Sequence, residues 1–586
     1  MSDRVELDQV YAALTSLPGV RDAAVHVARH VPGSRRIVAH MVTRTPLAEL
    51  RAALESRLPS HLVPTRFHRV PHIPLLPDGT TDRRALAALT SPEPDAAAPT
   101  PVQDPDEQAA RCDADADQGP PVTVPVTPQQ HTLLLDALAH RGTGRHVEQL
   151  HWRWHGPVDT DRFTAAWQAV FDRETVLRAA FDWETTPRLV LHEHAAVEVV
   201  RHPAGSVDFE ELRERDRLRD FDLRCPGLLR LNLVDEPDPA DGGPCVRILL
   251  TFHHVLLDGW SVSVLLQEFY RAYLAGGRLP GGERRPDIRD YARWLAGQDT
   301  APARDFWSSA APATTALVLP AMPAPATGLS GIGRAEARLG AGQADRLRVW
   351  AASCAATEAG ALQAAWALLL YRAAVAPGPA LVGFGVTVPG RGIALDSVER
   401  LPGLLMNALP MTVRVDPAAA MTELLAELRD RALDLASYEW VSLGQIHEWS
   451  GRRADDKLAE SLIVFENQRR SSDDLHSALA TQGISVERPR AAGVQSMFPV
   501  TLLAHRDVDD SLVLTAVHDR ARLADDDAAR LVGQCARLLH ELPGLKGGSA
   551  TVANALAAIA DEPQVRMAQA PAATPSSKPA RGEHRP

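Results

Sequence analysis

The chain of 586 residues lacks several features that mark large classes of protein. It has no uninterrupted run of the ~18 apolar residues that a membrane-spanning helix needs, and its start, MSDRVELDQV, has neither the basic residues nor the apolar core of a secretory signal. Its five cysteines are scattered without a C-x-x-C pair, which predicts reduced thiols in a cytoplasmic protein. A formal net charge of -12 disfavours a nucleic-acid partner, because such a partner calls for a basic face. We therefore expect a cytoplasmic protein that contacts neither membrane nor nucleic acid.

Composition divides the chain into folded segments and polar connections. Residues 91–122 are rich in Pro, Ala and Asp without apolar periodicity, which predicts a disordered acidic linker, and residues 549–586 are predicted to form a disordered tail. Between them, strand-like runs such as CVRILLTF alternate with helical patterns, which indicates a mixed α/β architecture. An Ala/Pro-rich stretch at residues 310–328 predicts a division of this region into two lobes, 123–310 and 329–545.

The stretch TFHHVLLDGWS places two histidines at the end of an apolar run. Because side chains alternate along a strand, His253 and His254 cannot both face one cleft, so one is expected to be chemical and the other structural. The segment after the turn reads as a helix with Ser261 as its N-cap. An ionised Asp258 accepts hydrogen bonds only and suits an orienting ion pair, while Gly259 permits a positive φ or close approach of a ligand. The pattern predicts a positioned imidazole.

On spacing alone, a core histidine with a surface aspartate explains this motif equally well. A metal site is disfavoured, because adjacent strand histidines point apart and the helical H-E-x-x-H pattern is missing. Gly383 and Gly385 lack the third glycine of a dinucleotide loop, and the sequence contains no P-loop and no G-x-S-x-G elbow. We expect neither a bound metal nor a bound cofactor.

HHVLLDGWS is similar to the active-site motif of condensation domains of nonribosomal peptide synthetases, and the resemblance extends over residues 123–545. Glu174 and Ala179 depart from the family pattern, which usually has histidine and threonine there. Further motifs follow in the family's order: VTPQQHTLLL, RETVLRAAF, FDLRCPGLLRLNLV, IRDYARW, PGRG, LPGLLMNALPMTVRV, VSLGQIHEWSG and SLIVFENQ.

The resemblance implies an α/β (α+β) fold of two chloramphenicol-acetyltransferase-like lobes arranged in a V, with a tunnel between them. It implies an acyltransferase of antibiotic biosynthesis, in which an acceptor amine attacks a donor thioester to form an amide bond. Both substrates are carried on phosphopantetheine arms of carrier proteins. It also implies that His254 is the catalytic imidazole, acting as a base or by positioning, and that His253 is packed. Asp258 becomes a structural anion, with Arg391 as the first candidate for its partner and Arg178 as the second.

The remaining motif residues bear on which branch of the family the chain resembles. Trp260 and Ser261 after Gly259 agree with the DGWS form of peptide-forming members rather than with epimerising relatives. Cyclising relatives have aspartate at the position of His253. By the same resemblance, Asn407 and Ser261 line the tunnel. Two other functions remain open: an acyltransferase that makes an ester or amide with a soluble acceptor, and a catalytically silent recruitment domain.

Residues 1–90 resemble the small C-terminal subdomain of adenylation domains and add a small α+β unit. The family has a lysine after the glycine of its last motif, whereas Thr80 follows Gly79 here, and a neutral hydroxyl cannot replace an ammonium at a phosphate. We expect no adenylation. LKGGSA, with Ser549, lacks the context of a carrier site, so donor and acceptor carriers are expected to act in trans. Residues 1–90 are either a docking surface for a partner synthetase or a remnant.

Overall fold

The computed structural model of this chain forms two compact units, Met1–Gln103 and Asp104–Pro586. The described residues are three strands and a few single positions in the first unit, and in the second 122–237, 243–279, 281, 285–311, 327–452, 456–466, 473–492, 497–545 and 550–563.

The first unit contains a three-stranded sheet, in which the central strand pairs antiparallel with one neighbour and parallel with the other. The strands are β1 (Val20–Ala28), β2 (Arg36–Thr43) and β3 (Arg66–Arg69). Ala39 and Met41 of β2 are buried against Val10, Leu14 and Leu54, which gives this unit a small core of its own.

The first lobe of the second unit is built on a sheet with the order β15-β5-β10-β9-β8. Two helices, α6 and α8, cover one face, where Trp154 of β5 meets Phe163 and Phe269 edge to face. Helix α7 packs on the opposite face. The bounds are α5 (Pro128–Ala139), β5 (Val147–His155), α6 (Thr160–Arg173), β8 (Glu198–His202), α7 (Phe209–Leu218), β9 (Leu229–Pro237), β10 (Pro244–His253) and α8 (Gly259–Leu274). A small sheet beside it contains β4 (Val122–Pro125), β6 (Ala179–Asp182) and β7 (Arg188–Leu191), and η1 (Thr175–Arg178) precedes β6.

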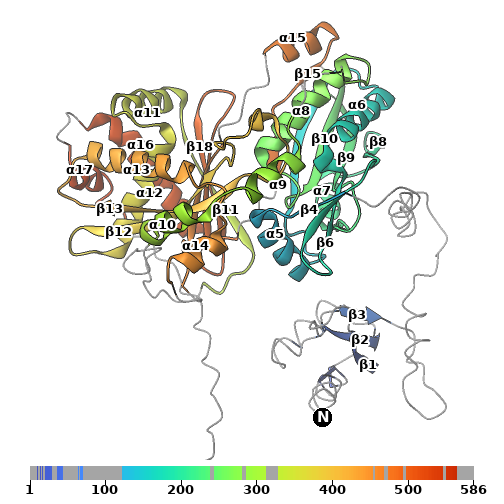
Figure 1. Cartoon of the computed structure of the whole chain (residues 1–586), viewed down its shortest axis with the longest axis horizontal. Coiled ribbons are helices and arrows are strands. Elements are labelled where there is room, and N and C mark those ends of the chain that lie inside the picture. Colours follow the sequence, from blue (N-terminus) through green and yellow to red (C-terminus); the bar gives the residue numbers. More distant parts are fainter. Residues whose placement is uncertain are drawn as a thin grey trace, which may run out of the picture. The chain divides into compact units, whose positions relative to one another are not determined.

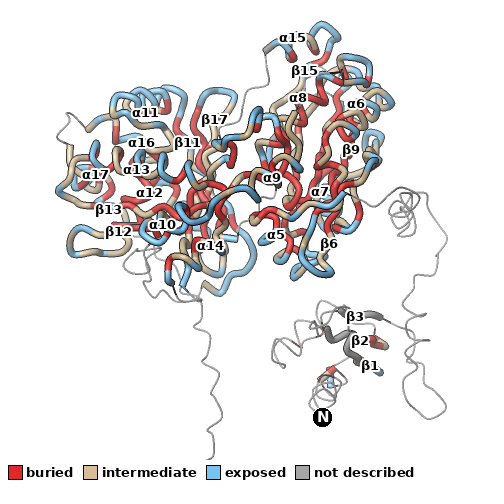
Figure 2. The backbone as a smooth tube through the Cα atoms, in the orientation of Figure 1, coloured by how far each residue is buried: buried red, intermediate tan, exposed pale blue. Residues whose placement is uncertain are grey.

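The second lobe is built on a mixed sheet with the order β11-β18-β17-β14-β12-β13. Its helices α11, α12, α13 and α16 pack on one face, and α12 is buried on almost all sides because its inner turns are alanine and leucine. The bounds are β11 (Ile332–Leu339), α11 (Ala341–Ser353), α12 (Glu358–Ala374), β12 (Ala380–Val388), η2 (Val398–Arg400), β13 (Asn407–Val415), α13 (Met421–Ala436), α14 (Leu443–Trp449), β14 (Ser461–Glu466), β17 (Val500–Arg506), β18 (Leu512–Asp519), α16 (Asp525–Glu541) and η3 (Leu542–Gly544). Figure 2 shows buried backbone along the strands of both lobes.

The two lobes exchange elements. Helix α9 (Ile288–Ala296) leads to α10 (Thr300–Ala310), whose Ala303 and Trp307 are buried in the core of the second lobe. In return, α15 (Asp473–Thr481), β15 (Ser485–Val486) and β16 (Arg490–Ala492) join the first lobe, where both strands pair with β5. Figure 1 shows α15, in orange, beside the green α8 of the first lobe. The predicted boundaries therefore separate the lobes along the sequence but not in space.

The chain continues to fold beyond the predicted start of the tail at residue 549. Helix α17 (Val552–Ala557) packs on the second lobe, and an isolated bridge joins Ala420 to Thr551. Val552 and Ile559 are fully buried. The prediction of a tail from residue 549 is therefore wrong for residues 550–563, because Val552, Ala555 and Ile559 bury an apolar face although the segment is rich in alanine. Residues 564–586, like most of the predicted linker 91–122, lie outside the described residues; β4 begins at Val122.

No helix within the described ranges is long and apolar enough to cross a membrane. Among the described cysteines, Cys245, Cys354 and Cys535 are free thiols, whereas Cys225 is disulfide-bonded. The prediction of reduced thiols is therefore wrong for Cys225, because spacing along a sequence does not reveal which sulfurs lie within bonding distance.

Truncation after Gly548 tests the assignment of α17 to the fold. Removing the buried Val552 and Ile559 side chains exposes their binding surface on the second lobe, and each fully buried aliphatic side chain contributes about 1.5–3 kcal/mol. We expect a lower midpoint in urea than for the full chain. Truncation after Pro563 is the control, because it keeps the whole helix. Equal midpoints for the two truncated chains would contradict the assignment.

Candidate active site

The histidine pair lies at the end of strand β10, with His253 as its last residue and His254 as the first residue of the turn, and the two side chains have different surroundings. His253 is buried, and its Nδ1 accepts a hydrogen bond from the backbone N–H of Val255 at 3.2 Å. Burial lowers the pKa of His253 to about 3, with smaller contributions from His146 and His254. The ring is therefore neutral and fills space beside Phe221.

His254 is half-buried, and its ring is held by its own turn. Its backbone N–H donates to the carbonyl oxygen of His146 at 2.7 Å, and its Nδ1 lies 2.9 Å from the carbonyl oxygen of Leu257. Because a carbonyl oxygen only accepts, Nδ1 must carry the hydrogen, which leaves the lone pair of the neutral ring on Nε2. No hydrogen bond of Nε2 to a described residue is present, so this nitrogen is available to a substrate.

Asp258, four residues beyond His254, begins helix α8. Its Oδ1 accepts from the backbone N–H of Ser261 at 2.8 Å and lies 2.7 Å from the Ser261 hydroxyl. The predicted N-cap, Ser261, is therefore wrong. Aspartate takes the position because its carboxylate reaches the third N–H after it.

The Asp258 carboxylate is fully buried and joins the first lobe to the second. Arg391 donates from Nη1 to Oδ2 at 2.9 Å and from Nη2 to Oδ1 at 3.2 Å. The backbone N–H groups of Leu405 and Met406 also donate to Oδ2, at 3.0 and 2.9 Å. Burial alone would raise the pKa of Asp258, but Arg391 and the hydrogen bonds from Ser261 outweigh it and hold the pKa below its ordinary value. The group is an ionised anchor.

The loop that carries Arg391 depends on its glycines. Gly390 has φ +65°, and a Cβ there would collide with the carbonyl oxygen of Leu405. The buried carboxylate of Glu439 accepts from the backbone N–H of Gly390 at 3.2 Å and from that of Gly392. Only glycine fits this conformation at position 390. The glycines of the PGRG motif thus allow the loop conformation that places the Arg391 guanidinium on Asp258.

The other motif residues of helix α8 also serve this anchor. Trp260 donates from Nε1 to the carbonyl oxygen of Glu399 at 2.8 Å, and the Arg391 guanidinium lies 5.4 Å from the centre of its ring. The Ser261 hydroxyl accepts from the N–H of Gly403 at 2.9 Å and from Arg391. Ser261 is fully buried, so it belongs to the junction between the lobes.

Three further candidates lie in different settings. Arg178 donates to the carbonyl oxygens of Phe171, His192 and Glu193 and does not meet Asp258, so the second choice of partner is wrong. Asn407 is buried, and its Nδ2 donates to the carbonyl oxygens of Glu439 and Val441. Gly259 is exposed with no atom within 4 Å of where a Cβ would lie, so only a ligand would require glycine here.

Sequence reasoning missed two groups that support the histidine turn. Gln130, fully buried, donates from Nε2 to the carbonyl oxygen of Val255 at 3.3 Å; its capping box with Thr127 was a readable signal. His146 has φ +62°, and its Nε2 lies 2.5 Å from Oδ2 of Asp136. No sequence pattern marks His146, because its contact with His254 depends on strand register.

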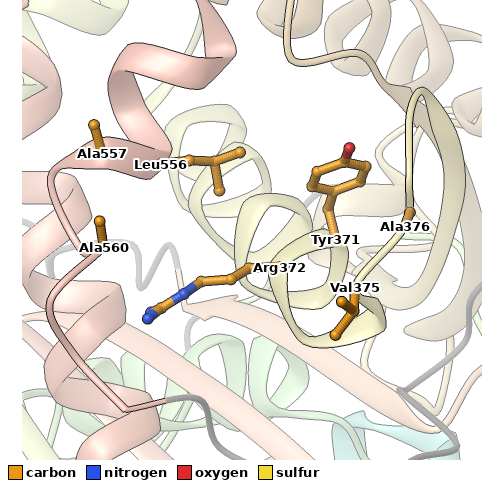
Figure 3. Close-up of a pocket in the computed structure, with 7 residues that line it drawn as sticks. All are labelled: Tyr371, Arg372, Val375, Ala376, Leu556, Ala557 and Ala560. Carbon is orange, nitrogen blue, oxygen red and sulfur yellow. The ribbon is translucent and has the colours of Figure 1, made fainter.

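The described residues contain no group of three or more His, Cys, Asp or Glu side chains that could hold a metal. An apolar depression lies between the end of α12 and α17, lined in part by Tyr371, Val375 and Leu556 (Figure 3). It carries no acid–base pair and does not include His254. The histidine turn, with the free Nε2 of His254, is therefore the candidate site for acid–base chemistry.

Fold and site together define a two-lobed α/β domain with a positioned imidazole beside the junction of the lobes. A family model described as the condensation domain matches residues 122–544, and one described as the AMP-binding enzyme C-terminal domain matches residues 9–79. The first match covers well over half of the chain. The chain therefore belongs to the condensation domain family of nonribosomal peptide synthetases, and the predicted family and two-lobe fold are confirmed.

Curated relatives are much longer proteins. One of the linear gramicidin synthase proteins of Brevibacillus parabrevis is 33% identical over 358 residues, which is 58% of this chain and 4% of the relative. Chondramide synthase cmdD of Chondromyces crocatus is 31% identical over 339 residues, which is 56% of this chain and 8% of the relative. The chain thus spans less than a tenth of either protein.

Solved structures share the fold. The first condensation domain of the calcium-dependent antibiotic synthetase, in complex with a substrate analogue, has a TM-score of 0.58 and 19% identity, covering 74% of this chain and 98% of that one. The X-domain from teicoplanin biosynthesis has a TM-score of 0.58 and 22% identity, covering 75% and 98%.

Replacing Asp258 with alanine tests the anchor. The change leaves the Arg391 charge buried and unpaired, for which a cost of about 3–5 kcal/mol in unfolding free energy is expected at pH 7. Because the pKa of Asp258 is depressed in the folded state, this difference is present above its ordinary value of 3.8 and is lost as the pH falls below it.

Urea unfolding at pH 7 and at lower pH measures this effect. Asp159→Ala is the matched control, since Asp159 is the exposed N-cap of α6 and its removal costs about 1 kcal/mol. If both variants lose the same stability, Asp258 is only a helix cap.

Glu174, which stands where the family usually has histidine, is buried in a cluster of charges. Its Oε1 lies 3.8 Å from Nη1 of Arg285, while the neighbouring Glu268 is bonded to Arg173, Arg271 and Arg285. Burial raises the pKa of Glu174 to about 7, only partly offset by Arg285. The folded protein therefore holds a proton that the unfolded chain releases near pH 4.5.

Glu174→Gln is accordingly expected to be more stable than the wild type above pH 7. Between pH 4.5 and 7 the folded wild type binds more protons than the unfolded chain, so its stability falls as the pH rises, and the uncharged glutamine removes this slope. Melting temperatures measured from pH 4.5 to 8 give the comparison. A constant difference between the two proteins over this range would rule out a raised pKa at Glu174.

Proposed function

We propose that this chain forms an amide bond by attack of an acceptor amine on a donor acyl thioester, with His254 as the catalytic residue. The observation that carries this proposal is the orientation of the His254 ring: Nδ1 is engaged by the Leu257 carbonyl, and Nε2 is left without a partner among the described residues. The fully buried pair of Asp258 and Arg391 holds the turn at the junction of the lobes.

The chemistry suits this nitrogen. An α-amine has a pKa of about 7.7–8.0, so a useful fraction is neutral near pH 7, and its attack creates a tetrahedral oxyanion and a proton to be lost from nitrogen. A neutral Nε2 accepts that proton or hydrogen-bonds the intermediate. Positioning of two tethered substrates lowers the reaction barrier by up to about 7–11 kcal/mol. General-base catalysis raises the rate ~10²–10⁴-fold, which corresponds to a smaller lowering of the barrier. His254 thus acts within a site whose main contribution is alignment.

We further propose that both substrates arrive on phosphopantetheine arms of carrier proteins that act in trans, and that residues 1–90 dock a partner synthetase. The family match over residues 122–544 supports carrier-borne substrates, and the match over residues 9–79 supports an adenylation-type surface near the start of the chain.

The direct test supplies the purified chain with acyl groups loaded on a carrier domain and with amines that are either carrier-bound or free. Mass spectrometry of the carriers and of released products detects the amide. Amide formation only with a carrier-bound amine supports the full proposal. Product with free amines alone would favour the soluble-acceptor function, and thioesters left intact with every amine would indicate a recruitment domain.

His254→Ala is expected to lower the single-turnover rate of amide formation by at least ~10², the low end for loss of a general base, with the fold retained. The ring is half-buried and stabilises only its own turn, so unfolding free energy should change little. His131→Ala, which removes an exposed histidine from α5, is the control. A His254→Ala rate close to that of the control would remove His254 from the chemistry.

A further inference from the structure

A carboxylate that the proposed mechanism does not use lies next to His254. Strand β5 pairs with β10 so that Glu148 lies opposite Phe252, and the pairing continues where the N–H of His254 donates to the carbonyl oxygen of His146. Glu148 and His254 therefore occupy diagonal positions across the two strands, with His254 in the turn that follows β10. Diagonal neighbours are close enough for long side chains to meet across two strands.

The second lobe adds two charged groups on the other side. On β11, Ala335 and Ala337 pack on the core of their lobe, so the alternation of side chains places Arg334 on the opposite face. On β14, Ile463 and Phe465 pack on the core, so Glu466 likewise lies on the opposite face.

The charges of His254, Arg334 and Glu466 all act on the carboxylate of Glu148. Glu148 is therefore within electrostatic reach of the turn that carries His254 and of two strands of the second lobe. Its surroundings hold one further carboxylate, Glu466, and one guanidinium in addition to the imidazole.

The Glu148 carboxylate makes no hydrogen bond or ion pair with any residue in the described part of the chain. In particular, Arg334 is close enough for its charge to act but forms no ion pair with it. Burial raises the pKa of Glu148, against the smaller effects of His254 and Arg334. The side chain is only partly buried, so its carboxylate is open to a ligand, and a cation that hydrogen-bonds to it in this partly desolvated place forms a charge-assisted bond.

The proposed reaction brings such a cation to this place. An α-amine with a pKa of about 7.7–8.0 is largely an ammonium ion at pH 7, with three N–H donors. The ammonium must lose one proton before it attacks, and His254, whose charge acts on Glu148, offers a free Nε2 to accept it.

We propose that Glu148 binds the acceptor substrate as an ammonium ion beside His254, with Glu466 adding negative charge from the second lobe. This inference rests on the proposed function. In the step it adds, one N–H bond of the ammonium breaks and one Nε2–H bond forms, so the amine becomes neutral and His254 becomes an imidazolium. The carboxylate of Glu148 then faces that imidazolium, which keeps the charge balanced while the amine attacks.

Binding of a small probe tests the inference without any thioester. L-alaninamide carries a protonated amine, and lactamide has a hydroxyl in its place with otherwise the same shape. Saturation-transfer NMR with the full chain is expected to show tighter binding of L-alaninamide at pH 7. The preference should fall above about pH 8 as the amine deprotonates, and also at low pH as Glu148 takes up a proton.

Glu148→Gln is expected to weaken L-alaninamide binding about tenfold, the order expected for one charge-assisted hydrogen bond, and to leave lactamide unchanged. Glu466→Gln should reduce the same preference by less. Glu336→Gln is the matched control, since Glu336 is an exposed carboxylate two residues beyond Arg334 on β11. It should bind both probes as the wild type does.

Several outcomes would overturn the inference: equal or absent binding of the two probes to the wild-type chain, or a Glu148→Gln variant that keeps the preference. Should Glu148→Gln fail to fold, the pH dependence of the wild type and the Glu466→Gln variant still decide the question. Because no acyl transfer takes part, these outcomes are separate from those that would contradict amide formation.

Discussion

The carboxylate of Asp258 is the constraint on which the rest of the site depends. This buried group caps helix α8. It also accepts hydrogen bonds from both terminal nitrogens of Arg391 and from the backbone N–H groups of Leu405 and Met406. The helix belongs to the first lobe and the loops join strands of the second, so this side chain fixes how the loops meet the helix, beside the elements that the lobes exchange. His254 lies one turn before it, and the direction of Nε2 follows from where that turn is anchored.

Residues that read as separate motifs are parts of the same junction. Gly390 shapes the loop around Leu405, Trp260 lies against the guanidinium, and the Ser261 hydroxyl joins both sides. A buried ion pair need not stabilise a protein relative to apolar residues, because desolvation of two charges is expensive. The pair instead selects one structure. Its hydrogen bonds form only when the loop and the helix meet in one arrangement, and in that arrangement the ring of His254 is held in place.

The sequence predicted what is local or shared with the family, and missed what depends on long-range contacts. Strand alternation predicted that the two histidines differ, and the family resemblance indicated that His253 is the packed one, as its burial shows. The N-cap was misplaced because Asp258 and Ser261 are both good caps and only the three-residue reach distinguishes them. The alanine-rich composition of residues 550–563 suggested a disordered tail and gave no sign of helix α17. The sequence around β15 likewise does not show that this strand pairs with β5 of the other lobe. Glu148 was overlooked for the same reason, since its charged neighbours come from the turn after β10 and from two strands of the second lobe.

A double-mutant cycle between Asp258 and Arg391 tests the central claim most directly. The unfolding free energies of Asp258→Asn, Arg391→Gln and the double variant are compared with that of the wild type in urea. Because either single change leaves the other group buried without its partner, we expect the double variant to be more stable than the sum of the single effects, with a coupling within the ~0.5–3 kcal/mol of interacting neighbours. Additive effects would show that the two groups do not act together in the folded protein and that this pair does not position His254.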